Sequence, residues 1–195
     1  MAKKRAVFLD RDGTLIRQVE VLHKISEVRI LPGVARVIRL LNRRGYLVAI
    51  TTNQPVVARG IIGSKEVDEI HAAIIERLRR RGAKIDAVYF CPHHPHGDVK
   101  KYRVKCRCRK PEIGMIMKAV KEHGIDLKKS FMVGDTTRDV LTGNRAGLTT
   151  ILVKTGFSGK DPHQFNGKPD FVARNLKEAA RFILRISKRH GIRTA

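Results

Sequence analysis

Short apolar runs alternate with longer amphipathic stretches along this chain of 195 residues. The runs are too short for helices and end at turn residues, which is typical of buried strands. They predict strands at 7–9, 46–50, 86–90, 130–133 and 149–153, with weaker strand character at 28–30. Apolar residues spaced three or four positions apart predict helices that cover residues 34–41, 67–78, 111–124, 139–146 and 176–184.

Strands that alternate with helices indicate βαβ units, and therefore a mainly parallel sheet with helices on both faces. We expect one α/β domain over residues 1–195, which is long enough to bury a core. The hydrophobic fraction of 42% fits a soluble protein, and no apolar run approaches the roughly 18 residues of a membrane helix. The basic start precedes an apolar run too short for a signal peptide, so we expect a cytoplasmic monomer with no membrane partner.

The formal net charge of +23 favours anionic partners, such as phosphate esters, nucleic acids or acidic surfaces. A dedicated nucleic-acid site would show clustered basic residues with aromatic residues among them. Here the basic residues are spread along the chain, and the local runs at 77–81 and 185–193 contain little aromatic material. A nucleic-acid partner is therefore the less favoured interpretation.

Two carboxylates, Asp10 and Asp12, follow the first predicted strand. Residues two apart in extended chain point to the same side, so both could face one small volume. Carboxylates held that close need a cation between them or a shared proton. This suits phosphoryl transfer, in which one carboxylate attacks phosphorus and the other carries a proton. Asp-x-Asp-Gly by itself is equally consistent with a polar turn.

Other polar residues follow later strands, and the carboxyl ends of parallel strands meet at one edge of a sheet. Thr52 and Asn53 offer uncharged donors that suit phosphate oxygens. Asp135 is a candidate third magnesium contact, beside Asp10 and the carbonyl of Asp12.

Two charged residues near helix starts complete the candidate site. Lys110 precedes a predicted helix and would add positive charge near a phosphate, although a lone lysine is usually a surface residue. Asp139 either holds a metal-bound water or favours the first turn of its helix.

All three cysteines of the chain lie in an irregular segment, 91–108. Cys91 with His93 and Cys106 with Cys108 form two closely spaced pairs separated by a loop, which is the pattern of a structural zinc site. His94 and His96 are competing ligands, and free thiols are the alternative. A disulfide framework would leave one cysteine over.

Four motifs, taken together, resemble those of the haloacid dehalogenase-like (HAD) phosphohydrolases. The motifs are Asp10-x-Asp12-Gly13-Thr14, the strand end at Thr52, Lys110, and Gly134-Asp135-x3-Asp139. The resemblance implies a Rossmann-like three-layer α/β/α sandwich and a magnesium-dependent phosphatase with an aspartyl-phosphate intermediate. By position, Asp10 would be the nucleophile and Asp12 the general acid and base. Thr52 and Lys110 would hold the phosphoryl group, and Asp135 would complete the magnesium site.

Further segments are similar to the D,D-heptose 1,7-bisphosphate phosphatases and the related histidinol phosphatases. They are Thr52-Asn53-Gln54, Ala58-Arg59-Gly60, Cys91-Pro92-His93-His94-Pro95 and Cys106-Arg107-Cys108-Arg109-Lys110-Pro111. This resemblance adds Asn53, Gln54, Arg59 and Arg109 to the candidate substrate site. It also implies a capless enzyme whose mouth is shaped by residues 16–31, the Arg59 loop and the zinc loop.

Three departures from these families concern the substrate: Pro55, Thr136 and the segment 17–22. We therefore carry three hypotheses. The first is a phosphatase acting on a sugar bisphosphate, such as D-glycero-D-manno-heptose 1,7-bisphosphate, or on histidinol phosphate. The second is a nucleic-acid 3′-phosphatase. The third is a non-catalytic binding module, for which the second carboxylate, Asp12, would be unnecessary.

Overall fold

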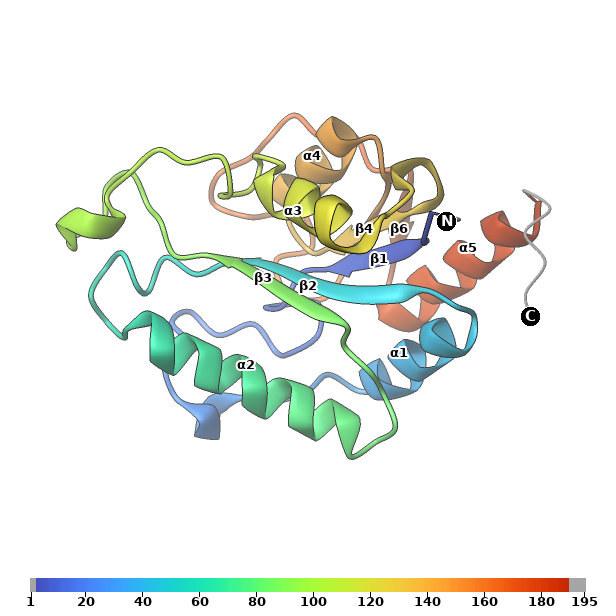
Figure 1. Cartoon of the computed structure of the whole chain (residues 1–195), viewed down its shortest axis with the longest axis horizontal. Coiled ribbons are helices and arrows are strands. Elements are labelled where there is room, and N and C mark those ends of the chain that lie inside the picture. The colour runs from blue at the N-terminus through green and yellow to red at the C-terminus, as the bar shows by residue number, and fades with distance from the viewer. Residues whose placement is uncertain (1–2, 190–195) are drawn as a thin grey trace.

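The computed structural model of the chain describes residues 3–189 and has a parallel sheet at its centre (Figure 1). Within these residues the sheet has six strands in the order β3-β2-β1-β4-β5-β6. The strands are β1 (Ala6–Leu9), β2 (Leu47–Asn53), β3 (Ala87–Cys91), β4 (Phe131–Gly134), β5 (Thr149–Val153) and β6 (Phe171–Ala173). All five neighbouring pairs are parallel, as the alternation of elements predicts.

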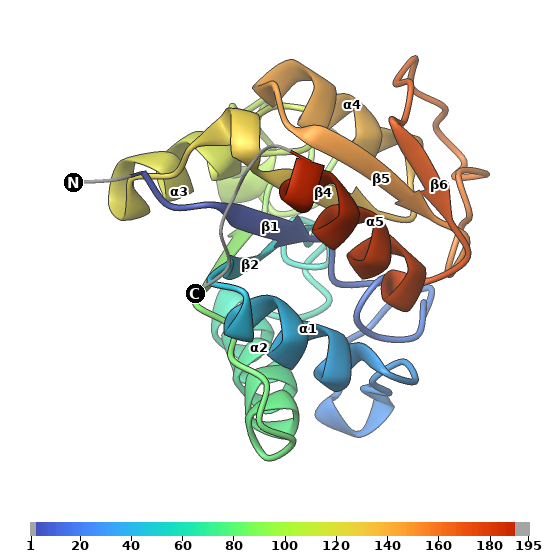
Figure 2. The ribbon, with the colours of Figure 1, turned by 90° about the vertical axis from the view of Figure 1, so that its right-hand side faces the viewer.

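Helices cover both faces of the sheet and make three layers (Figures 1 and 2). The helices are α1 (Val34–Arg43), α2 (Ser64–Arg79), α3 (Gly114–His123), α4 (Thr137–Ala146) and α5 (Leu176–Arg189). Helices α1, α2 and α5 lie on one face, whereas α3 and α4 lie on the other. Short 3-10 turns occur at Ile25–Glu27, Lys100–Tyr102 and Leu127–Lys129.

Strand β1 is buried on both faces, which explains why its sequence is continuously apolar. Val7 and Leu9 contribute to the core under α1, α2 and α5. Ala6 and Phe8 contribute to the core under α3 and α4. The centre of the sheet therefore holds the residue that follows β1 in a rigid place.

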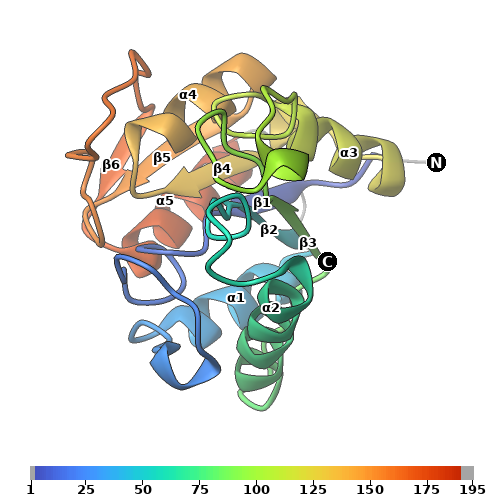
Figure 3. The same cartoon turned by 90° about the vertical axis from the view of Figure 1, so that its left-hand side faces the viewer.

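The strand register aligns the carboxyl ends of the three central strands. Leu9 at the end of β1 pairs with Ile50 of β2 and with Val133 of β4. The segments that follow these strands meet at one edge of the sheet, which faces the viewer in Figure 3. The sequence motifs at 10–14, 51–54 and 134–139 are brought together in this way.

The prediction differs from the structure at several places. The predicted strand at 28–30 is wrong, because this segment pairs only through an isolated bridge between Ile16 and Ile30. Strand β6, at the β5 edge of the sheet, was not predicted, because a strand of three residues is too short to show a period. Strand β2 runs on to Asn53, and α3 begins at Gly114 rather than at 111.

Among the described residues, no helix combines the length and the apolar character that crossing a membrane would require. The basic run at 185–193 lies only partly within the described residues, since these end at 189.

Candidate active site

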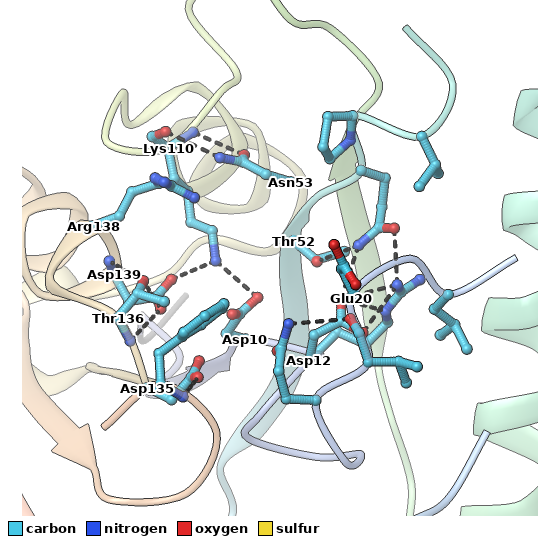
Figure 4. Close-up of a pocket in the computed structure, with 18 of the residues that line it drawn as sticks. Asp10, Asp12, Glu20, Thr52, Asn53, Lys110, Asp135, Thr136, Arg138 and Asp139 are labelled. Atoms are coloured by element: carbon cyan, nitrogen blue, oxygen red, sulfur yellow. Dashed lines mark hydrogen bonds and ion pairs between the residues drawn. The ribbon is translucent and has the colours of Figure 1, made fainter. Parts of the chain in front are cut away.

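A cavity of about 220 Å³ lies at the carboxyl edge of the sheet (Figure 4). The predicted residues that line it are Asp10, Asp12, Thr52, Asn53, Gln54, Arg59, Arg109, Lys110 and Asp135. Gln18, Val19, Glu20 and Leu22 of the 16–31 segment form part of its wall, as do Arg138 and Phe157. Side chains from six separate stretches of the chain therefore share one opening to solvent.

Three buried carboxylates form a cluster in this cavity. Oxygens of Asp10, Asp135 and Asp139 all lie within 4.8 Å of one another. Burial, and then the charge of Asp139, raise the pKa of Asp10 to about 6. Burial, and then the charge of Asp10, raise the pKa of Asp135 to about 8. The cluster therefore concentrates more negative charge than its protein neighbours neutralise.

Lys110 is the cation that the protein itself supplies to this cluster. Its side chain is only 3% exposed, and Nζ lies 2.9 Å from Asp10 Oδ1. Nζ also donates to a carboxylate oxygen of Asp139 and to the carbonyl of Thr51. Burial by itself would lower the pKa of Lys110, but the two carboxylates outweigh it and raise this pKa. The lysine is therefore charged and is held between the two acids.

The second carboxylate oxygen of Asp139 caps the start of helix α4. It accepts hydrogen bonds from the backbone N–H and the hydroxyl of Thr136, which form a capping box at the start of α4. Of the two interpretations that the sequence leaves open, the structure directly displays the helix-start role. Because both oxygens have protein partners, Asp139 orients Lys110 from a fixed position.

Asp135 has a free oxygen that suits a cation. Its Oδ2 accepts a hydrogen bond of 2.7 Å from the backbone of Phe157, whereas its buried Oδ1 has no hydrogen-bond partner within the described part of the chain. A Cβ atom at Gly13 or at Gly156 would lie 2.2 Å from Oδ2, so both positions need glycine. Magnesium prefers carboxylate oxygens, so the raised pKa values and this unpartnered oxygen fit a magnesium ion.

Asp12 borders the same cavity but stands apart from the carboxylate cluster (Figure 4). Its carboxylate accepts a forked pair of hydrogen bonds from Arg11, of 3.0 and 3.1 Å. Gln54 Nε2 also donates to it, at 3.1 Å. The two motif aspartates thus line one cavity but pair with different cations: Asp10 pairs with Lys110, and Asp12 pairs with Arg11.

The polar residues at the end of β2 are engaged by protein groups. The amide of Asn53 exchanges two hydrogen bonds of 3.0 Å with the backbone of Lys110. The hydroxyl of Thr52 accepts a hydrogen bond from Gln54. Asn53 therefore ties the Lys110 loop to the sheet in addition to lining the cavity.

The four predicted zinc ligands come together in the loop between β3 and α3. The sulfur atoms of Cys91, Cys106 and Cys108 and a ring nitrogen of His93 lie within 4.8 Å of one another. Hydrogen bonds from neighbouring thiols, Cys91 first, lower the pKa of Cys108 to about 5. Thiolate sulfur is the form that binds zinc, so this donor set fits a closed tetrahedral site.

Three arginines line the cavity without a carboxylate partner among residues 3–187. Arg109 is half-buried and donates only to the carbonyl of His93, at 3.0 Å. Burial, and then the charge of Arg138, lower the pKa of Arg109. Arg59 is exposed at the mouth. Sequence reasoning missed Arg138, since its place on the first turn of α4 carries no distinguishing pattern.

Sequence reasoning also missed two buried residues behind Asp12. Arg11 is 1% exposed, and its Nη1 lies 3.2 Å from Nε2 of His71 on α2. An arginine between two aspartates resembles a polar turn residue, and a histidine on an apolar helix face resembles a core residue. Only the contact between Arg11 and His71, which are 60 positions apart in the sequence, distinguishes them from an ordinary turn residue and an ordinary core residue.

Comparison with known proteins gives relatives for the whole fold. A family model described as HAD-hydrolase-like matches residues 107–179. The chain is 39% identical over 155 residues to a D-glycero-beta-D-manno-heptose-1,7-bisphosphate 7-phosphatase of Haemophilus ducreyi, covering 78% of this chain and 85% of that protein. It is 38% identical over 185 residues to a D-glycero-D-manno-heptose-1,7-bisphosphate 7-phosphatase of Thermosynechococcus vestitus, covering 91% and 94%.

A solved structure resembles the present one over nearly its whole length. It is the D,D-heptose 1,7-bisphosphate phosphatase of B. bronchiseptica, complexed with magnesium and phosphate, with 29% identity and a TM-score of 0.80. The match covers 93% of this chain and 99% of that chain. Sequence and fold agree, and the chain belongs to the HAD phosphatases, in the group that contains the heptose-bisphosphate phosphatases.

Proposed function

We propose that this phosphatase uses magnesium to remove one phosphate from a sugar bisphosphate, and that D-glycero-D-manno-heptose 1,7-bisphosphate is its substrate. The observation that carries the mechanism is the buried cluster of Asp10, Asp135 and Asp139 with Lys110. The names of the relatives support the heptose over histidinol phosphate and over a nucleic-acid 3′-phosphate.

Asp10, Asp135 and the backbone carbonyl of Asp12 would hold the magnesium ion. When bound, magnesium would neutralise the crowded carboxylates and the charge that builds up on the phosphoryl oxygens. The unpartnered Oδ1 of Asp135 supports this assignment, since a buried carboxylate oxygen without a partner is costly.

Asp10 is placed at the end of the central strand and would attack phosphorus with one carboxylate oxygen. The bond between phosphorus and the ester oxygen breaks, and Asp12 gives its proton to the departing oxygen. A water molecule then attacks the aspartyl-phosphate, Asp12 takes a proton from it, and Asp10 is released with inorganic phosphate. Lys110 and Thr52 would hold the phosphoryl oxygens throughout.

The three arginines without carboxylate partners support a substrate with a second phosphate. Arg59, Arg109 and Arg138 repel one another unless an anion lies among them. Guanidinium groups bind phosphate through paired hydrogen bonds, so they suit a doubly phosphorylated sugar. The uncharged part of such a substrate would contact the cavity wall formed by the segment 18–22.

We also propose a structural zinc ion bound by Cys91, His93, Cys106 and Cys108. Its role would be to order the loop that precedes Arg109 and Lys110. Support comes from the four clustered donors and from the polar composition of the loop, which has few apolar residues of its own to bury.

The decisive experiment substitutes the proposed nucleophile. Asp10→Asn should lower magnesium-dependent release of phosphate by about 10³-fold or more, because an amide cannot form the covalent intermediate. Asp68→Asn, at an exposed position of α2, is the matched control and should keep full activity. Turnover retained in freshly purified Asp10→Asn would refute the proposed mechanism.

A further inference from the structure

Asp12 is held by a set of hydrogen bonds that extends away from the cavity. Arg11 Nε donates to its Oδ2 and Arg11 Nη2 donates to its Oδ1. Gln54 Nε2 donates to Oδ2 as well, and Gln54 Oε1 accepts from Arg11 Nη2 at 2.8 Å. The side chain of Asp12 is 20% exposed, so one side of the carboxylate faces solvent while the other side is fixed.

Arg11 is bound in turn by the helix beneath it. The Arg11 guanidinium uses Nε and Nη2 for Asp12 and Gln54, which leaves Nη1 for a contact with α2. This Nη1 meets Nε2 of His71 at 3.2 Å. A buried guanidinium thus links Asp12 at the cavity to His71 on α2.

His71 is an acceptor in this contact. Burial, and then the charge of Arg11, lower its pKa to about 3, so the ring is neutral near physiological pH. A neutral imidazole has one accepting nitrogen, and the contact with Nη1 assigns this role to Nε2. The proton then resides on Nδ1, which is buried without a hydrogen-bond partner among the described residues.

This arrangement is a poor choice for stability. The rest of the buried face of α2 is aliphatic, with Val67, Ile70, Ile74 and Leu78. The buried Nδ1 donor without a partner costs about as much free energy as the charge-assisted hydrogen bond to Arg11 returns, so the histidine adds little net stability. An aliphatic residue would serve the core better, so the histidine answers a need of Arg11.

We propose that His71 is a positioning residue, which fixes Arg11 and thereby aims the carboxylate of Asp12 at the leaving-group oxygen. This inference rests on the proposed role of Asp12 as proton carrier. In phosphoryl transfer the attacking and leaving oxygens lie roughly in line on opposite sides of phosphorus. The proton carrier must therefore stand away from the nucleophile, and the Arg11 contact holds Asp12 apart from Asp10 in this way.

The test compares two substrates whose leaving groups differ in their need for a proton from Asp12. An alkyl phosphate needs Asp12 to protonate its leaving oxygen, whereas p-nitrophenyl phosphate releases a stable anion without that proton. His71→Leu removes the acceptor for Arg11. We expect it to slow alkyl phosphate hydrolysis roughly 10- to 100-fold, while the rate of the first p-nitrophenolate burst changes by less than about threefold.

Steady-state turnover of p-nitrophenyl phosphate should still fall in His71→Leu, because Asp12 must also take the proton from the attacking water. The burst amplitude should stay at the wild-type value, since it counts correctly folded sites. His71→Gln is the conservative variant: its amide oxygen can accept from Arg11, and it should restore alkyl phosphate hydrolysis to within about threefold of wild type.

Ile74→Ala is the matched control for a packing defect on the same helix face. It should affect both substrates in equal proportion. If His71→Leu is too unstable to purify, Arg11→Lys serves instead, because a lysine keeps the charge but cannot bridge Asp12 and His71. It should show the same selective loss.

An equal fall in the rate of alkyl phosphate hydrolysis and in the rate of the first p-nitrophenolate burst in His71→Leu would overturn the positioning role. A His71→Gln variant as impaired as His71→Leu would also overturn it. So would wild-type alkyl phosphate turnover in both His71→Leu and Arg11→Lys. The Asp10→Asn result is independent of these outcomes, because it tests the covalent step and not the aim of Asp12.

Discussion

At the scale of single residues, the site depends on how closely the backbone approaches Asp135. Gly13 and Gly156 both have positive φ, and both lie against the same carboxylate oxygen. Gly13 belongs to the first sequence motif, but its contact with Asp135 could not be predicted, and Gly156 could not be assigned to the site, because a glycine in a turn is common and its neighbour in space is unknown. The structure makes these two glycines part of the proposed magnesium site.

Gly156→Ala should therefore weaken magnesium binding in addition to straining the backbone. A Cβ at this position would lie 2.2 Å from Asp135 Oδ2, so Asp135 must move. We expect magnesium affinity to fall by about tenfold or more, since displaced ligands weaken metal binding. Magnesium titration of phosphatase activity, with direct binding by calorimetry, measures the change.

Gly147→Ala is the matched control for this substitution. Gly147 has nearly the same backbone angle, with φ of 70° against 61°, and nothing lies within 4 Å of the added Cβ. Both variants should lose about 1–2 kcal/mol of unfolding free energy from the left-handed conformation. Equal magnesium affinity in the two would contradict the role assigned to Gly156.

At the scale of elements, the loop between β3 and α3 carries two residues of the cavity. Its end is attached in three ways: by the cysteine and histidine cluster, by the bond from Arg109 to the carbonyl of His93, and by the two bonds between Asn53 and Lys110. Loss of the first attachment would loosen Arg109 more than Lys110, because Lys110 is also held by β2 and by two carboxylates.

Removal of zinc should consequently raise KM more than it lowers kcat. The purified protein should contain about one zinc per chain, and less than about half an equivalent would count against the site. In Cys106→Ser we expect zinc loss, faster proteolysis within 91–108 and a KM roughly tenfold higher. His96→Ala, which alters an exposed histidine outside the cluster, should keep both zinc and KM.

At the scale of the whole molecule, the net charge of +23 is compatible with two kinds of anionic partner, a small phosphate ester and a nucleic acid. Arg59, Arg109 and Arg138, which have no carboxylate partner among the described residues, line a cavity of about 220 Å³, which fits a sugar bisphosphate. A general basic surface would instead attract any polyanion in a salt-dependent way.

A substrate panel separates these two cases. We expect turnover of D-glycero-D-manno-heptose 1,7-bisphosphate to exceed that of histidinol phosphate and of a 3′-phosphorylated oligonucleotide by about 100-fold or more in kcat/KM. Arg138→Ala should lower the ratio of kcat/KM values between the heptose bisphosphate and the other two substrates, because the second phosphate loses one contact. Efficient, salt-sensitive turnover of the oligonucleotide would reverse the ranking of substrates.

Much of the fold could be predicted because its signals are local. The apolar run before Asp10 and the spacing of Ile70, Ile74 and Leu78 report burial and period within a few residues. The wrong strand at 28–30 shows the limit: a segment with strand-like side chains forms a strand only when it pairs along a neighbouring strand, and this one has only an isolated bridge between Ile16 and Ile30. The prediction of one domain over residues 1–195 stays a prediction.

The sequence alone determined the order of the five longer strands and of the helices, and the meeting point of the polar strand ends, because periodicity and the polarity of strand ends are properties of neighbouring residues. Only the tertiary structure decided how the charges pair. Asp10 meets Lys110 and Asp12 meets Arg11, with His71 behind it. Those pairings depend on register across the sheet and on the direction of each side chain, and no local pattern encodes either.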